Sequence, residues 1–152
     1  CCSDLQLIGM LQVRSCSVEE AVACSRQIPE LKNPYPAAEY EQRLSGVPHL
    51  LLLAESDGDM AGFKAGYERA GVFYSWMGGV CPEYRRQGVA QALAREQENW
   101  AKAEGYRHIR FKTRNYLKPM LIFALNNGFY ITAVEKRADP LSNRIWLEKV
   151  LI

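Results

Sequence analysis

The sequence has no long hydrophobic run. Its longest strongly apolar stretch is residues 50–54, whereas a membrane-spanning helix needs about 20 such residues, so we expect no membrane segment and no membrane partner. The chain also lacks internal repeats and low-complexity tracts, which excludes solenoid and fibrous classes and argues against disorder. With 152 residues, 48% of them hydrophobic and 24% charged, the chain is predicted to form one globular domain, residues 1–152.

Residues that hold metal ions or build disulfide frameworks are few. The five cysteines stand at positions 1, 2, 16, 24 and 81, an odd number whose spacing matches no disulfide or zinc pattern. His49 and His108 each stand alone. We therefore expect free thiols, as in a reducing cytoplasm, and no metal site.

The chain also lacks a strong excess of one charge. Its net charge of +2 excludes the overall basic field that is typical of nucleic-acid binders, so we expect no nucleic-acid partner. The charge is uneven, however: residues 1–80 carry six basic and ten acidic side chains, and residues 81–152 carry thirteen and seven. Either the second half meets an anion, or the difference is a chance division of one surface.

Hydrophobic periodicity and turn residues predict alternating strands and helices. Ser17 and Glu20 form a capping-box pattern that predicts a helix from there to about Glu30. Further helices are expected over residues 37–44, 88–104 and 117–126, and strands over residues 5–13, 49–55, 60–68, 71–80, 108–114, 129–136 and 144–150. Hairpins require antiparallel pairs and the strand–helix–strand segments allow parallel ones, so the fold class is α/β with a mixed sheet.

The segment between the fourth strand and the long helix has the features of an anion cradle. The strand ends at Val80, Pro82 starts a turn, Arg85 and Arg86 add positive charge, and Gly88 opens the helix. The first amide hydrogens of a helix have no intrahelical partner, and a glycine leaves them accessible. Such a site suits a pyrophosphate. It is not a Walker loop, because no Gly-Lys-Ser/Thr sequence follows.

This segment resembles the signature of the GNAT superfamily of N-acetyltransferases. The matching residues are Val80-Cys81-Pro82 followed by Arg85-Arg86-Gln87-Gly88-Val89-Ala90, at a strand-to-helix junction. The resemblance extends over most of the chain, up to the late helix that closes in Asn127-Gly128-Phe129. It implies a roughly seven-stranded mixed sheet that splays between strands 4 and 5 and is flanked by about four helices. It also implies transfer of an acetyl group from acetyl-CoA to a primary amine.

The resemblance assigns a cofactor role to one group of residues. The strand glycines would pair with the pantetheine arm, and the loop amides would hold the pyrophosphate. The residues concerned are Gly78, Gly79, Val80, Arg85, Arg86, Gln87, Gly88, Val89, Ala90 and Asn115. By themselves, Gly78 and Gly79 predict a β-bulge or a close approach of the backbone to another group. Asn115 is equally well explained as a turn residue that caps the next helix.

The usual proton-transfer residues of the family are absent. Many relatives carry a tyrosine acid where this chain has Ala124, and some use a strand glutamate base where it has Tyr74. Glu55 and Glu68 end the hairpin strands and are our candidates for a base that acts through water; the alternative is a solvated strand-end charge. Tyr116 is our candidate for the acid, with Tyr130, Tyr74 and water as alternatives.

Two features bear on the acceptor. Arg110, Lys112 and Arg114 share one face of a strand; they either attract an anionic cofactor or acidic substrate or form a solvated basic face. The aromatic residues of the hairpin and fourth strand, Tyr67, Phe73, Tyr74 and Trp76, pack in the core or line an acceptor cleft.

Two main functions are therefore open, and a third reading, a generic nucleotide-phosphate binder, would require binding of ATP rather than CoA. The first is an N-acetyltransferase that acts on a small-molecule or peptide amine by direct transfer in a ternary complex, without a covalent enzyme intermediate and without a nucleophilic role for Cys81. The second is a non-catalytic acyl-CoA-binding sensor or interaction module on the same fold. A homodimer is compatible with either function.

Overall fold

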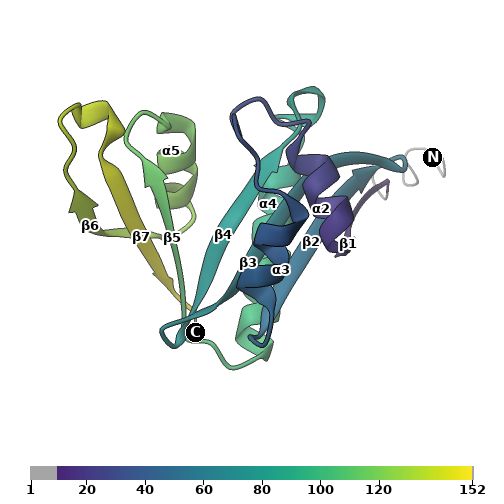
Figure 1. The fold of residues 1–152 in the computed structure, drawn as a ribbon, viewed down its shortest axis with the longest axis horizontal. Coiled ribbons are helices and arrows are strands. Elements are labelled where there is room, and N and C mark those ends of the chain that lie inside the picture. Colours follow the sequence, from purple (N-terminus) through teal and green to yellow (C-terminus); the bar gives the residue numbers. More distant parts are fainter. Residues whose placement is uncertain (1–9, 152) are drawn as a thin grey trace.

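The computed structural model describes residues 10–151, which form seven β-strands and four α-helices (Figure 1). In chain order these are β1 (Leu11–Ser15), α2 (Val18–Ser25), α3 (Ala37–Leu44), β2 (His49–Ser56), β3 (Asp59–Arg69), β4 (Val72–Val80), α4 (Val89–Ala103), β5 (His108–Arg114), α5 (Lys118–Asn126), β6 (Tyr130–Glu135) and β7 (Arg144–Val150). Two short 3₁₀ turns, η1 (Pro82–Tyr84) and η2 (Pro140–Ser142), complete the described chain. None of the helices within residues 10–151 is long and apolar enough to cross a membrane.

The strands form one mixed sheet in the order β1-β2-β3-β4-β5-β7-β6. Neighbouring strands run antiparallel except β4 and β5, which are parallel and pair only at Phe73 with Ile109 and at Tyr74 with Arg110. Beyond Tyr74 the two strands separate, and the sheet divides into an N-terminal arm, β1 to β4, and a C-terminal arm of β5, β7 and β6 (Figure 1). The expected mixed sheet and its splay between strands 4 and 5 are confirmed.

Helices cover both faces of the N-terminal arm. Along β2, Leu51 and Leu53 pack toward α2 and α3, whereas Leu50, Leu52 and Ala54 pack on the α4 side. A strand buried on both faces reads as a continuous apolar run rather than an alternating one. The longest apolar stretch of the sequence is therefore the second strand of the sheet.

The first helix is shorter than the sequence predicted. The capping box at Ser17 and Glu20 is present, but α2 ends at Ser25 and not near Glu30. Ser25 donates its hydroxyl to the carbonyl of Val22 at 2.7 Å, and the backbone then tightens, with the amide of Ile28 bonded to the carbonyl of Ser25. Pro29, which has no amide hydrogen, prevents further helix. Of the expected first strand, residues 5–9 lie outside the described residues, and β1 extends to Ser15.

The bulge in β4 also lies elsewhere than expected. Met77 pairs with Ala65 and Ser75 pairs with Gly66, so Trp76 is the extra residue. Gly78 and Gly79 instead match the other prediction for paired glycines, a close approach of the strand backbone to a neighbouring group. A Cβ atom on Gly79 would lie 2.9 Å from Cδ1 of Ile28, so the missing side chain lets the segment after α2 pack against the end of β4.

Candidate functional site

The N-terminus of α4 is open and uncapped. Its N-cap is Gly88, at φ 82°, with no side-chain cap and no acidic residue in the first turn. By contrast, α2 has a complete capping box and two acids, Glu19 and Glu20, in its first turn. A Cβ atom on Gly88 would meet nothing within 4 Å. The first amides of α4 and the positive end of its dipole are therefore free to meet an anion.

The loop before α4 is held by its own polar contacts. Gln87 donates its side-chain amide to the carbonyl of Glu83 at 3.1 Å, and Arg86 adopts a left-handed backbone with φ 62°. Arg85 donates to the carbonyl of Val80 at 3.2 Å and to Glu30 at 2.5 Å. Arg85 thus ties the loop to the segment after α2, while Arg86 stays exposed.

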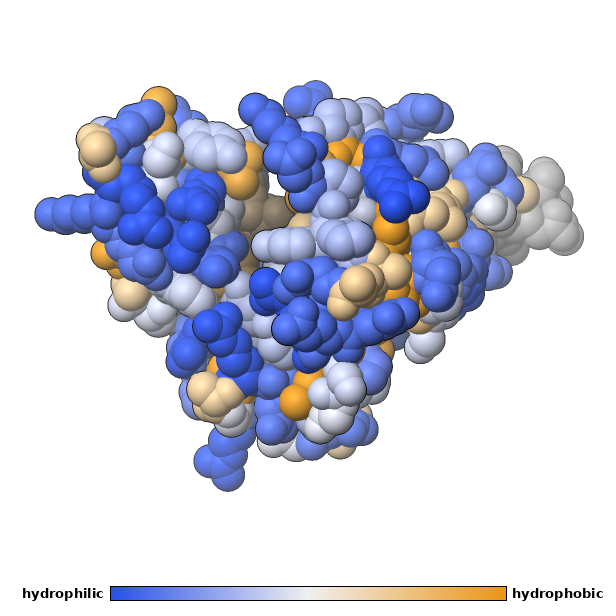
Figure 2. All heavy atoms as spheres, viewed as in Figure 1, coloured by the Kyte–Doolittle hydropathy of each residue, from blue (hydrophilic) through white to orange (hydrophobic). Residues whose placement is uncertain are grey.

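The edge of β4 beyond Tyr74 lacks a strand partner on the β5 side among the described residues. Residues 75–80 are half-buried there and pair on their other side with β3. Their backbone groups that point toward β5 can accept an extended ligand as an added strand-like segment. This edge runs directly into the loop that ends at the α4 N-terminus. Figure 2 shows a hollow between the two arms with hydrophilic residues around it.

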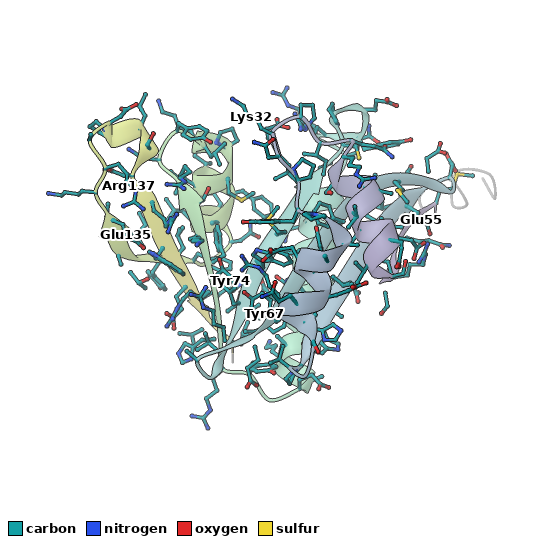
Figure 3. All side chains as sticks on the ribbon, viewed as in Figure 1. Lys32, Glu55, Tyr67, Tyr74, Glu135 and Arg137 are labelled. Carbon is teal, nitrogen blue, oxygen red and sulfur yellow. The ribbon has the colours of Figure 1, made fainter. Side chains whose placement is uncertain are left out.

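The three predicted proton-transfer residues do not come together. Glu55 forms an ion pair with Arg14 at 2.9 Å at the far side of the N-terminal arm (Figure 3). Glu68 accepts a hydrogen bond of 2.8 Å from the hydroxyl of Tyr106; burial and this bond raise the pKa of Tyr106 to about 12. Tyr116 is 56% exposed after β5.

The position of the usual tyrosine acid belongs to the core. Ala124 is buried against Ile145 and Leu147, which leaves no proton donor at that site. Asn115 donates its side-chain amide to the carbonyl of Pro140 at 3.1 Å, and its backbone amide to Asn143 at 2.9 Å. Asn115 therefore joins the end of β5 to the segment between β6 and β7.

Cations seated on aromatic rings lie on both arms, and sequence reasoning did not place them together. Arg43 lies 4.6 Å from the ring centre of Trp76, Arg69 lies 5.1 Å from that of Tyr74, and Lys112 lies 5.4 Å from that of Trp146. Tyr74 and Trp146 are themselves 6.2 Å apart across the point of divergence. We call these six residues, with Arg144, the basic aromatic cluster. Its sequence signals were the alternation of basic residues along β5 and the aromatic residues of β4, and neither showed that they meet.

Lys64 is another side chain that sequence reasoning missed. It lies opposite Gly78 in the β3–β4 pairing, and a Cβ atom on Gly78 would lie 3.3 Å from Cγ of Lys64. Burial lowers the pKa of the Lys64 ammonium to about 8, although the negative charge of Glu98 acts to raise it. Within residues 10–151, no group of three or more metal-ligating side chains is arranged to hold a metal ion.

Comparison with known families fits this geometry. A model of the acetyltransferase (GNAT) family matches residues 17–129, which include the β4 edge, the loop and α4. The chain belongs to the GNAT family of acetyltransferases. No curated protein sequence matches this GNAT protein.

Solved structures share the GNAT fold at low sequence identity. The ribosomal-protein-S18-alanine N-acetyltransferase from Escherichia coli superposes with a TM-score of 0.81 at 15% identity, covering 93% of this chain and 94% of that one. The PaiA N-acetyltransferase from Thermoplasma acidophilum, in complex with coenzyme A, gives 0.75 at 18% identity, over 92% and 98%. YncA from Salmonella typhimurium, with its cofactor acetyl-CoA, gives 0.73 at 12% identity, over 94% and 95%.

Proposed function

We propose that this GNAT protein, acting as one catalytic domain, transfers the acetyl group of acetyl-CoA to a primary amine. The observation that carries the proposal is the unpaired edge of β4 leading into the uncapped, open N-terminus of α4. Family membership supports acyl transfer, and the coenzyme A and acetyl-CoA in two of the similar structures support the donor.

The open start of α4 and the unpaired edge of β4 are suited to acetyl-CoA. The amides of residues 86–90 would hold the pyrophosphate at the positive end of α4, with Arg86 adding a formal charge. The backbone of Gly78 to Val80 would pair with the pantetheine arm. Arg85 would act indirectly, because its ion pair with Glu30 positions the loop.

The reaction needs no covalent enzyme intermediate. The lone pair of a neutral amine attacks the thioester carbonyl, the C–N bond forms and the C–S bond breaks. One proton leaves the nitrogen, and one is taken up by the sulfur of the departing thiolate, so the products are an amide and free CoA. Backbone amides near the Trp76 bulge are suited to stabilise the oxyanion, and one such donor is typically worth about 3 kcal/mol.

Proton transfer in this proposal depends on water rather than on the usual pair of residues. Ala124 and Tyr74 occupy the positions of the family's acid and base. Glu68 and Tyr116 remain our candidates for residues that pass protons through water, whereas the ion pair of Glu55 with Arg14 assigns Glu55 to stability. The free thiols of Cys16, Cys24 and Cys81 accord with the cytoplasmic location that we expect.

The proposal is tested by incubating the protein with acetyl-CoA and a mixed panel of primary amines while free thiol is followed. We expect thiol release that depends on the amine and yields the acetylated product by mass spectrometry. Tight binding of acetyl-CoA without thiol release on any amine would instead support the non-catalytic acyl-CoA-binding module. Failure to bind acetyl-CoA at all would overturn both functions.

A further inference from the structure

The basic aromatic cluster lies where the two arms meet. Arg69 is the last residue of β3, Lys112 lies on β5 and Arg144 begins β7. The rings of Tyr74 and Trp146 connect the two arms. Figure 3 shows Tyr74 at the junction of the arms. Residues far apart in the sequence thus bring their positive charges to one place.

Acids balance these charges only in part. Burial is the main reason that the pKa of the Lys112 ammonium lies below its usual range, and nearby positive charge lowers it further. Three guanidinium groups supply that charge, those of Arg144, Arg69 and Arg43. Glu135 opposes them. Four cations thus face two carboxylates, Glu39 and Glu135, and this excess of positive charge costs free energy in the absence of an anion.

Donors within the cluster also remain available. Arg43 is engaged, since it bonds Glu39 at 2.7 Å and the hydroxyl of Tyr67 at 3.0 Å. Among the described residues, however, Arg69 forms no ion pair within 4.0 Å. Arg144 pairs with Glu135 at 3.8 Å through Nη1, but its Nε is buried without a hydrogen-bond partner. A buried N–H group without a partner is costly, and a ligand that accepts its hydrogen bond removes that cost.

A small cavity opens beside Arg69. Its volume is about 220 Å³, and its lining includes Arg69, Tyr74, Arg110 and Trp146. Arg110 is paired with Glu148 at 3.4 Å, so Arg69 carries the free charge of the lining. The cavity has room for several water-sized groups, since one water occupies about 30 Å³ of liquid.

We propose that the acceptor carries a carboxylate close to its amine, and that Arg69, Lys112 and Arg144 bind this carboxylate at the junction of the arms. This inference rests on the proposed acetyl transfer and names the class of its acceptor. A guanidinium group and an ammonium group beside aromatic rings favour a planar anion that is partly withdrawn from water. A polyamine or a lysine-rich peptide would meet like charge.

The cluster is too distant to be the pyrophosphate site. Tyr74 precedes Val80 by six positions along β4, which corresponds to about 20 Å at a rise of roughly 3.3 Å per residue. The open helix N-terminus follows Val80. The two anion sites therefore lie at opposite ends of the same strand edge, and the acceptor would approach from the end opposite the pyrophosphate.

The same excess of positive charge would assist the chemistry. A primary amine has a pKa of roughly 10 in water, and cations nearby disfavour its protonated form. The cluster would thus hold the amine in its neutral, nucleophilic state while the carboxylate of the acceptor supplies the attraction. This accounts for a site that functions without a glutamate at position 74.

The binding part of the inference is tested by calorimetry with succinate, a dicarboxylate without an amine, on the full chain. We expect binding by the wild type, at least tenfold weaker binding by Lys112→Gln and by Arg69→Gln, and no change in Arg95→Gln, whose side chain is exposed on α4. Thermal melting checks that each variant folds. Absence of succinate binding, or equal binding by all four proteins, would overturn the inference whether or not acetyl-CoA binds.

The kinetic part compares aspartate, asparagine and asparaginamide, which carry two, one and no carboxylates on one skeleton. With saturating acetyl-CoA, we expect kcat/KM to fall in that order, and the order to flatten in Lys112→Gln. A peptide with Asp at its amino end, compared with free aspartate, separates a peptide acceptor from a small-molecule acceptor, and either preference supports the inference. Preference for spermidine or asparaginamide would contradict it while leaving acetyl transfer intact. If none of these amines reacts, the succinate measurement decides.

Discussion

Tyr74 of β4 pairs with Arg110 of β5, and this is the last pair before the two strands separate. On one side of that pair the sheet is continuous. On the other side, β4 offers an unpaired edge that leads to the α4 N-terminus, while β5 carries Lys112 into the basic aromatic cluster. The position of this one pair therefore sets where both the proposed donor site and the proposed acceptor site lie.

The geometry around that pair depends on Gly66. A Cβ atom there would lie 2.5 Å from the ring of Phe73 and 2.8 Å from the carbonyl oxygen of Tyr74. We expect Gly66→Ala to lower the free energy of unfolding by about 2–3 kcal/mol, because the ring and the bulged strand must both shift. Denaturant unfolding measures this.

Gly46→Ala is the control for this substitution. Gly46 has φ 77° and open space around it, so its replacement costs only backbone strain of about 1–2 kcal/mol. If Gly66→Ala and Gly46→Ala are equally stable and bind acetyl-CoA nearly equally, the junction of the arms does not depend on the absence of a side chain at position 66.

Lys64 predicts a specific dependence of stability on pH. Its pKa is about 8 in the folded protein and 10.5 as the reference value. Between these values the unfolded chain holds a proton that the folded protein has released, so the free energy of unfolding rises with pH. The rise amounts to at most about 3 kcal/mol. Unfolding of wild type and Lys64→Met from pH 7 to 10.5 should differ by this rise, and parallel curves would disprove the assignment.

Cys81 is expected to have no chemical role. Its thiol is buried 4.0 Å from that of Cys24, and burial raises the pKa of both groups, so both are protonated and unreactive at neutral pH. Cys81→Ala should retain acetyl transfer within about twofold and lose about 1 kcal/mol of stability. Loss of turnover in Cys81→Ala with unchanged acetyl-CoA binding would require a covalent route.

Much of the fold follows from local sequence, and the features that do not are set by partners distant in the chain. The strand-to-helix segment from Val80 to Ala90 was readable because its turn, its glycine and its helix are consecutive. The bulge at Trp76 was not, since its position depends on the register that β3 imposes and on the space left by Gly66. The early end of α2 is an exception with a local cause, because the capping box fixes where the helix starts while Ser25 and Pro29 decide where it ends.

The candidate site was predictable to the same extent. The anion cradle is local, so its residues could be named in advance. The basic aromatic cluster joins Arg43, Arg69, Lys112 and Arg144, which lie on four different elements. The alternation along β5 and the aromatic run of β4 were visible in the sequence, but their meeting was not. Glu55 was chosen as a strand-end acid, but its partner Arg14 stands across the β1–β2 pair, and this contact could not be read from the position of Glu55 alone.

Acetyl-CoA binding is proposed to depend most on a diphosphate held by the bare amides at the start of α4. Calorimetric titration of acetyl-CoA into wild type, Gly88→Glu and Gly46→Glu tests this directly, because both glycines have positive φ and open surroundings and both variants add the same charge. We predict at least about tenfold weaker binding by Gly88→Glu, which is about 1.4 kcal/mol, and wild-type affinity for Gly46→Glu. Unchanged affinity in Gly88→Glu, with the fold intact by circular dichroism, would contradict the account.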